Sequence, residues 1–78
     1  MYRFLIVIEK ARKNYSAYSP DLPGCAATGK TVKEAEFNMQ EAIKMHCRGL
    51  IEDGLKIPQS DSHAEYIILS DECLPKSA

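Results

Sequence analysis

The stretch Asn14–Thr31 constrains this chain most, because it places two strand candidates, a rigid turn and a helix start in close succession. The turn, Ser19–Gly24, contains two prolines, each of which fixes its own φ and favours an extended conformation in the preceding residue. Gly24 permits a positive φ that other residues avoid. We therefore expect a stiff connection between two short strands, in which the Asp21 side chain bonds to the nearby backbone.

Two strands flank this turn, and a third precedes them. Residues 2–9 include the uninterrupted apolar run Phe4–Ile8, which is typical of a central strand with apolar neighbours on both faces. Residues 14–19 alternate, with Tyr15, Ala17 and Ser19 on one face. Residues 25–29 form a short run of small side chains, and the basic segment 10–13 is expected to be a solvated hairpin tip. These three strands predict an antiparallel meander.

A helix is predicted over residues 32–53. Thr31 and Glu34 have the spacing of a capping box, in which each side chain accepts a hydrogen bond from the other residue's amide. Gly54 is expected to end the helix in a left-handed conformation, with Leu55 near Leu50 as in a Schellman motif. The apolar residues share one stripe suited to covering a sheet: Val32, Ala35, Met39, Ala42, Ile43, His46 and Leu50.

Residues 65–70 are predicted to form a fourth strand, and residues 71–78 a tail too short to fold by itself. The helix can act as a crossover that places this strand parallel to the first. We expect a single α+β domain over residues 1–78, with two layers and the element order β-β-β-α-β. One helix lies on a four-stranded mixed sheet of order 3-2-1-4. Its uncovered face is expected to expose an apolar patch, which favours a homo-oligomer, a dimer or higher, or partner binding.

The composition narrows the functional classes. The chain has 78 residues and a formal net charge of −1, so it lacks the basic surface typical of nucleic-acid-binding domains. A domain of this size buries a small core and gains stability from a partner. The apolar run Phe4–Ile8 is too short for a signal or membrane segment. Cys25, Cys47 and Cys73 show no pairing pattern, which favours free thiols in a reducing cytoplasm, with Cys25 buried.

The residues at the centre of the chain carry a family resemblance. The run Tyr15–Cys25 is followed by Thr28-Gly29-Lys30-Thr31, then by Glu34-Ala35, Asn38 and Glu41-Ala42-Ile43. This pattern resembles the HicB antitoxin family over residues 2 to about 58. The resemblance implies a partial RNase H-like fold without activity, which binds and masks a small basic HicA-type toxin that cleaves messenger RNA. Many family members continue into a DNA-binding domain, for which residues 71–78 leave no room, so direct DNA binding by this chain is not expected.

Catalysis is not expected, and neither is a cofactor or a metal. Two-metal hydrolysis of the RNase H type needs several carboxylates, whereas the centres of the first and fourth strands are Leu5–Val7 and Ile67-Ile68. His46 and Cys47 are adjacent on the helix and diverge by about 100°, so they do not form a metal pair. Two alternatives to the antitoxin remain open: an oligomeric domain that binds another protein or a small ligand, and an RNase H-type nuclease.

Five residues are candidates for partner binding. Tyr18, Asp21, Leu22 and Pro23 belong to the rigid turn, and a preorganised loop loses little entropy on binding. Phe37 lies about 140° from Val32 around the helix, away from the apolar stripe, and is a second candidate contact.

Overall fold

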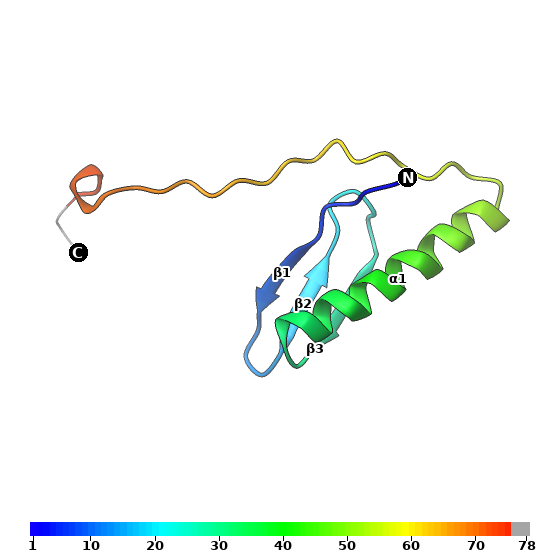
Figure 1. Cartoon of the computed structure of the whole chain (residues 1–78), viewed down its shortest axis with the longest axis horizontal. Coiled ribbons are helices and arrows are strands. Elements are labelled where there is room, and N and C mark those ends of the chain that lie inside the picture. Colours follow the sequence, from blue (N-terminus) through cyan, green and yellow to red (C-terminus); the bar gives the residue numbers. More distant parts are fainter. Residues whose placement is uncertain (76–78) are drawn as a thin grey trace.

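A single helix packs on a small antiparallel sheet in the computed structural model, which describes residues 1–75. The strands are β1 (Val7–Lys10), β2 (Tyr15–Tyr18) and β3 (Ala26–Gly29). They are followed by the helix α1 (Val32–Glu52) and, after a long extended segment, by the 3-10 helix η1 (Asp71–Cys73). Figure 1 shows α1 lying along one face of the sheet and the extended segment leaving the body beyond the N-terminus. The predicted α+β class is thus correct.

The sheet has the order β1-β2-β3, and both pairs of strands are antiparallel, as the meander predicted. Val7 lies opposite Tyr18, which in turn lies opposite Ala26. Ala17 lies opposite Ile8 on one side and Ala27 on the other. Because successive residues of a strand point to opposite faces, the Ala17 row faces α1 and the Tyr18 row faces away from it.

The core lies between the sheet and α1. Its buried members are Ala17, Leu22, Cys25, Ala35 and Met39. Partly buried residues pack around them: Phe4, Ile6, Ile8, Tyr15, Ala27, Ala42, Ile43 and Cys47. The predicted stripe on α1 therefore covers the sheet through its central residues. Val32, at the first position of α1, remains 46% exposed.

Both ends of α1 follow from local sequence. The Glu34 amide donates to Thr31 Oγ1 at 3.0 Å, which confirms the predicted N-cap. The Glu34 carboxylate accepts from the Lys30 amide at 3.1 Å, so the predicted return bond to the Thr31 amide was wrong by one residue. At the C-terminus the Leu55 amide donates to the Leu50 carbonyl at 2.8 Å, and Gly54 has a φ of 72°. This is the predicted Schellman motif.

The helix starts in close contact with the end of β3. A Cβ atom at Gly29 would lie 2.3 Å from the backbone nitrogen of Ala35. Nearby, the Asn38 side-chain amide donates to the Thr28 carbonyl at 2.8 Å, and this bond ties α1 to β3. The absence of a side chain at position 29 therefore sets how closely the two layers approach.

The predicted fourth strand was wrong, and so was the four-stranded mixed sheet of order 3-2-1-4. Residues 54–70 contain no helix or strand, and the described sheet ends at β1 on one side and β3 on the other. The apolar run Tyr66–Leu69 has β propensity, but propensity alone does not form a strand without a hydrogen-bonded neighbour. Residues 76–78 of the predicted tail lie outside the described residues.

The first strand was also predicted to be central, and it is an edge strand. It begins at Val7 rather than at residue 2 because Val7 already lies opposite Tyr18, the last residue of β2. Residues before Val7 lie beside the turn that contains Pro20, and proline has no amide hydrogen to donate. The apolar run Phe4–Ile8 is accordingly half-buried rather than enclosed on both faces.

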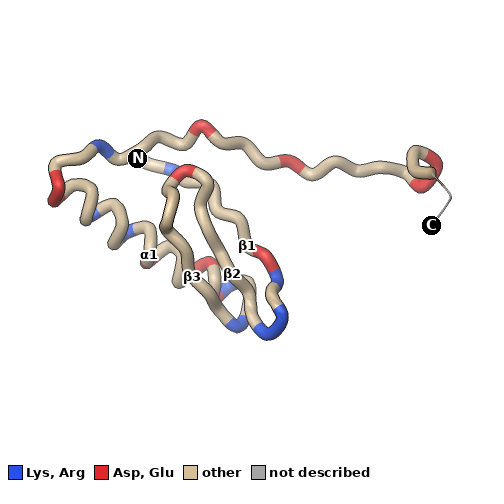
Figure 2. Tube along the Cα trace, turned by 180° about the vertical axis from the view of Figure 1, so that it is seen from behind, with Lys and Arg blue, Asp and Glu red and all other residues tan. Residues whose placement is uncertain are grey.

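The basic segment between β1 and β2 is a hairpin tip, as predicted. Its turn is closed by a hydrogen bond of 2.7 Å from the Ala11 amide to the Asn14 carbonyl. Lys10, Arg12 and Lys13 are exposed there. Figure 2 shows these cations gathered at the end of the hairpin, while the rest of the sheet carries few charges.

Candidate functional site

The turn Ser19–Cys25 is compact and internally hydrogen-bonded. The Leu22 amide donates to the Ser19 carbonyl at 3.2 Å, and the Cys25 amide donates to the Leu22 carbonyl at 3.1 Å. Gly24 has a φ of 84°, in the left-handed region where a side chain is strained. These consecutive tight turns give the segment a fixed shape, as its two prolines predicted.

Asp21 connects the turn to the start of the chain. Its Oδ2 accepts a hydrogen bond of 2.8 Å from the Leu5 amide, and its own amide donates to Ser19 Oγ at 3.2 Å. The hydrogen bond from Leu5 lowers the pKa of this carboxyl, with a further contribution from the nearby Ser60 hydroxyl, against the opposing effect of desolvation. The Asp21 carboxylate therefore ties the segment that leads into β1 to the turn.

The second oxygen of Asp21 is different. Oδ1 is buried and has no hydrogen-bond partner among residues 1–75, although the Ser62 hydroxyl lies near enough to favour the charged carboxylate. The polar segment 60–62 thus lies against the turn. The sequence did not predict this contact between the turn and the segment after α1, because a single sequence does not indicate which distant residues lie together.

The predicted partner-binding residues of the turn fall into two groups. Tyr18 is 43% exposed and Pro23 is also exposed, so both side chains are available to a partner. Leu22 is 1% exposed and lies in the core, and Asp21 is buried as well. The side chains of Leu22 and Asp21 hold the turn in place from within, and contact with a partner at all four positions stays a prediction.

Phe37 lies elsewhere on the molecule. It is 62% exposed on α1, whereas Ala35 and Met39, on either side of it in sequence, are fully buried against the sheet. Positions two apart on a helix point in nearly opposite directions. Tyr18 lies on the face of the sheet that α1 does not cover. The structure therefore does not bring Phe37 and the turn together into one surface.

The uncovered face of the sheet is apolar at one end only. Val7 and Tyr18 lie opposite each other there, followed by Ala26. The adjoining row contains Glu9, Ser16 and Thr28 in place of apolar residues. The apolar patch predicted for this face is hence restricted to the half near the turn.

A groove lies between α1 and the N-terminal segment that leads into β1. Its volume is about 450 Å³, and its walls include Tyr2, Phe4 and Ile6 from the N-terminal segment and Ile43 from α1. The rings of Tyr2 and Phe4 stack, with centroids 6.4 Å apart and planes 5° apart. Tyr2, Phe4 and Ile6 alternate along the chain, and this alternation was a sequence signal for the apolar wall. The sequence analysis missed it because it expected a fourth strand at this edge.

Two of the thiols and one histidine lie near one another: Cys25 and His46 line the same hollow, and Cys47 is close enough to add to the rise in the Cys25 pKa. Cys25, Cys47 and Cys73 are free, and Cys25 is buried as predicted. Burial raises the pKa of the Cys25 thiol, which keeps it protonated and poorly nucleophilic. Within residues 1–75 no three residues of the types His, Cys, Asp and Glu come together as a metal site. Among the same residues, no helix has the length and apolar character to span a membrane.

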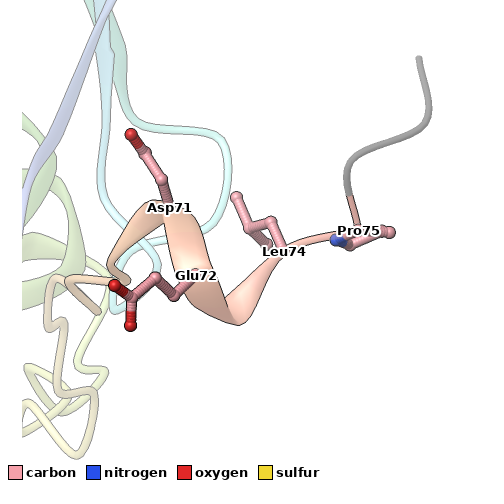
Figure 3. Close-up of a pocket in the computed structure, with 4 residues that line it drawn as sticks. All are labelled: Asp71, Glu72, Leu74 and Pro75. Carbon is pink, nitrogen blue, oxygen red and sulfur yellow. The ribbon is translucent and has the colours of Figure 1, made fainter.

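A hollow near the C-terminal end of the described chain surrounds η1. It is lined by Asp71, Glu72, Leu74 and Pro75, all of them exposed. Figure 3 shows the two carboxylates pointing in different directions from this single turn of chain. Because no other segment within residues 1–75 lines it, this hollow has no second wall to give a ligand a defined place.

Comparison with known proteins identifies the family. The profile described as "HicB_like antitoxin of bacterial toxin-antitoxin system" matches residues 4–72, which include the sheet, the rigid turn, α1 and the extended segment. This chain belongs to the HicB-like antitoxin family. The resemblance predicted from the turn and the helix start is thereby confirmed.

Relatives of this HicB-like protein occur in a bacteriophage, an archaeon and a bacterium. A 14.9 kDa protein of the rep-hol intergenic region of Haemophilus phage HP1 is 42% identical over 62 residues, which are 80% of this chain and 47% of the phage protein. A UPF0150 protein of Thermoplasma acidophilum is 36% identical over 77% of this chain and 88% of its own length. A UPF0150 protein of Helicobacter pylori is 43% identical over 63% of this chain and 68% of its own length. The chain thus spans about half of the phage relative and most of the archaeal one.

A solved structure supports the same assignment. The HicB-like chain superimposes on a chain of the "HicA3 and HicB3 toxin-antitoxin complex" with a TM-score of 0.61 and 27% sequence identity. The match covers 76% of this chain and 72% of that one. The two chains share their fold as well as a detectable sequence relationship.

Proposed function

We propose that this HicB-like protein is an antitoxin that binds a HicA-like toxin and masks its active surface. Its family membership and its similarity to a chain of a HicA3–HicB3 complex are the observations that carry this proposal. In this proposal the protein acts by binding and not by catalysis. Its net charge of −1 leaves it compatible with a small basic partner.

The rigid turn is the surface that we propose for toxin binding. Tyr18 is exposed at the apolar end of the uncovered sheet face, and Pro23 is exposed within the turn that follows it. The buried side chains of Asp21 and Leu22 hold the backbone beneath them, so little conformational entropy is lost when a partner binds. Phe37, which is exposed on α1, is the alternative candidate for toxin contact and lies on a separate surface.

Co-expression with the small protein encoded next to this gene tests the proposal. We expect a stable complex on affinity purification and restored growth of cells that express the toxin. Absence of a complex with the adjacent gene product would contradict the antitoxin role. Absence of a toxin-like neighbouring gene would favour the other binding-domain interpretation.

Two matched variants then test the surface. Tyr18→Ala is expected to weaken the complex by about 30-fold, because an aromatic anchor at the centre of an interface contributes roughly 2 kcal/mol or more. Phe37→Ala removes an aromatic side chain of similar size and greater exposure from α1, and is expected to leave affinity unchanged. The opposite ranking would place the toxin on α1, and would leave the antitoxin role intact.

A further inference from the structure

The formal net charge of −1 conceals an uneven distribution of charge along the chain. The segment 57–75 contains no lysine or arginine and four carboxylates, those of Asp61, Glu65, Asp71 and Glu72. Residues 1–56 therefore hold nine of the ten cations but only seven of the eleven carboxylates. Figure 2 shows the acidic residues after α1 spread along the extended segment, away from the cations of the hairpin. The folded body is thus basic, although the whole chain is slightly acidic.

Five cations of the body meet at one end of it. Lys10 lies opposite Tyr15, and Tyr15 lies opposite Gly29, so the β1–β2 hairpin loop and the connection from β3 to α1 leave the sheet at the same end. Because only β2 separates β1 from β3, these two connections are about 10 Å apart. We call this surface the basic end, and its cations are Lys10, Arg12, Lys13, Lys30 and Lys33.

The cations of the basic end are exposed and are not neutralised by ion pairs. Within residues 1–75 the two ion pairs lie elsewhere, one further along α1 and one after it. The nearest carboxylates are those of Glu9 and Glu34, and Glu34 already accepts a hydrogen bond of 3.1 Å from the Lys30 amide. Five cations against two carboxylates leave an excess of positive charge at this end, which attracts anions.

The residues between the cations indicate which kind of anion fits. The hairpin loop adds Ala11 and Asn14 to its cations and contains no aromatic or large aliphatic side chain. Protein partners bind around a desolvated apolar centre, for which this end offers only Val32, at 46% exposure. Phosphodiester groups need only cations and hydrogen-bond donors. The chemistry of the basic end therefore favours a nucleic-acid backbone over an acidic protein.

The shape of the basic end favours a single strand over a duplex. The end is narrow, because it consists of one hairpin loop and one short connection. A DNA duplex is stiff over about 150 base pairs, so it lies across such an end and meets few of its cations. A flexible single strand can bend around the end, so that successive phosphates reach the hairpin and then the connection to α1.

We propose that the basic end binds the phosphodiester backbone of a single-stranded nucleic acid. The contact is electrostatic and does not read the base sequence. It lies at the opposite end of the sheet from the rigid turn, where Tyr18 pairs with Val7. The basic end is therefore a second surface, and its binding does not depend on the antitoxin role.

Fluorescence anisotropy with a labelled oligo(U) RNA tests this proposal on the full chain without toxin. We expect a Kd on the order of 10 μM at about 50 mM salt. The plot of log affinity against log salt concentration should have a slope of about −3, because each phosphate contact in a single strand releases roughly 0.7 counterion. Single-stranded DNA of the same length should bind within about threefold of the RNA, since both present the same phosphates.

Paired substitutions locate the contact. Arg12→Ala with Lys13→Ala removes two hairpin cations and is expected to weaken binding by roughly 10-fold or more and to make the salt slope shallower by about 1.4. Lys30→Ala with Lys33→Ala should have a similar effect from the other connection. Lys44→Ala with Arg48→Ala removes the same charge from exposed sites further along α1 and should leave the affinity unchanged. Circular dichroism establishes that all three variants retain α1.

Several outcomes would overturn the proposal. One is a wild-type chain that fails to bind the RNA at about 50 mM salt, or binds it with no dependence on salt. Another is a loss of affinity in the Lys44→Ala, Arg48→Ala variant as large as that in the hairpin variant, which would indicate charge in general. Duplex DNA or polyglutamate bound as tightly as the RNA would contradict the single strand or the phosphate. Binding to phosphatidylglycerol vesicles in place of the RNA would assign the basic end to a lipid surface.

Discussion

Gly29 offers the sharpest test of how the helix is positioned on the sheet. In Gly29→Ala the new Cβ would lie 2.3 Å from the Ala35 nitrogen and 2.8 Å from both the Ala35 Cα and the Glu34 carbonyl carbon. All three are backbone atoms of the first turn of α1, so no side-chain rotation relieves the overlap. The helix start must move by about 1 Å, against a densely packed interior.

The expected cost follows from this geometry. Overpacking a well-packed site costs about 1–3 kcal/mol, and we expect the upper end, about 3 kcal/mol, because only backbone can yield. Total stability for a domain of this length is about 4–12 kcal/mol, so the loss is a large fraction of it. Thermal unfolding followed by circular dichroism should show a Tm lower by about 12–24 °C.

Gly49 supplies a matched control. It lies within α1 with no positive φ, and a Cβ there meets nothing within 4 Å. Gly49→Ala should therefore gain about 1 kcal/mol of helix propensity and raise the Tm by about 4–8 °C. Both variants add one methyl group, but Gly29→Ala is expected to lower the Tm and Gly49→Ala to raise it. A Gly29→Ala protein that melts at or above the wild-type temperature would refute the close contact between β3 and α1.

Three further predictions concern the turn, the helix cap and the thiols. Because the pKa of the Asp21 carboxyl is lowered in the folded chain, the charged carboxylate should stabilise the fold fully above the ordinary carboxyl pKa, and this stabilisation should be lost as pH falls through the lower folded value. Asp21→Asn should flatten this part of a curve of stability against pH. An unchanged slope would count against the hydrogen bond from Leu5. Thr31→Ala should cost about 1 kcal/mol in urea unfolding, with Thr31→Ser nearly neutral, and equal stabilities would contradict the cap. Cys25 should react with iodoacetamide much more slowly than exposed Cys73 in the folded chain, and at a similar rate in denaturant; equal rates in the folded chain would show that Cys25 is not shielded.

Local chemistry made much of this fold predictable. The capping residue Thr31 and the left-handed Gly54 are short-range signals, so the ends of α1 could be placed to within about one residue. The prolines and Gly24 likewise marked the turn, and the alternation of β2 placed Ala17 and Ser19 on one face, where both are buried. Each of these features depends on residues a few positions apart, which a single sequence records directly.

The remaining features depend on contacts between distant segments. The run Tyr66–Leu69 is as apolar as a strand, yet its pairing depends on how the connection after Gly54 positions it, and no local pattern encodes that. The bond between Asp21 and Leu5 spans sixteen positions and was missed for the same reason. For the binding surface, the sequence favoured the rigid turn, which stays a prediction, and it could not separate the buried Leu22 from the exposed Tyr18.

The two edges of the sheet differ in a way that limits how copies can assemble. At the β3 edge the Asn38 side chain occupies the Thr28 carbonyl, so an incoming strand meets an acceptor that is already bonded. The start of the β1 edge is flanked instead by residues 64–66 of the same chain, which lie beside Ile6, Val7 and Ile8. A single amide side chain on the helix thus hinders strand addition at the β3 edge.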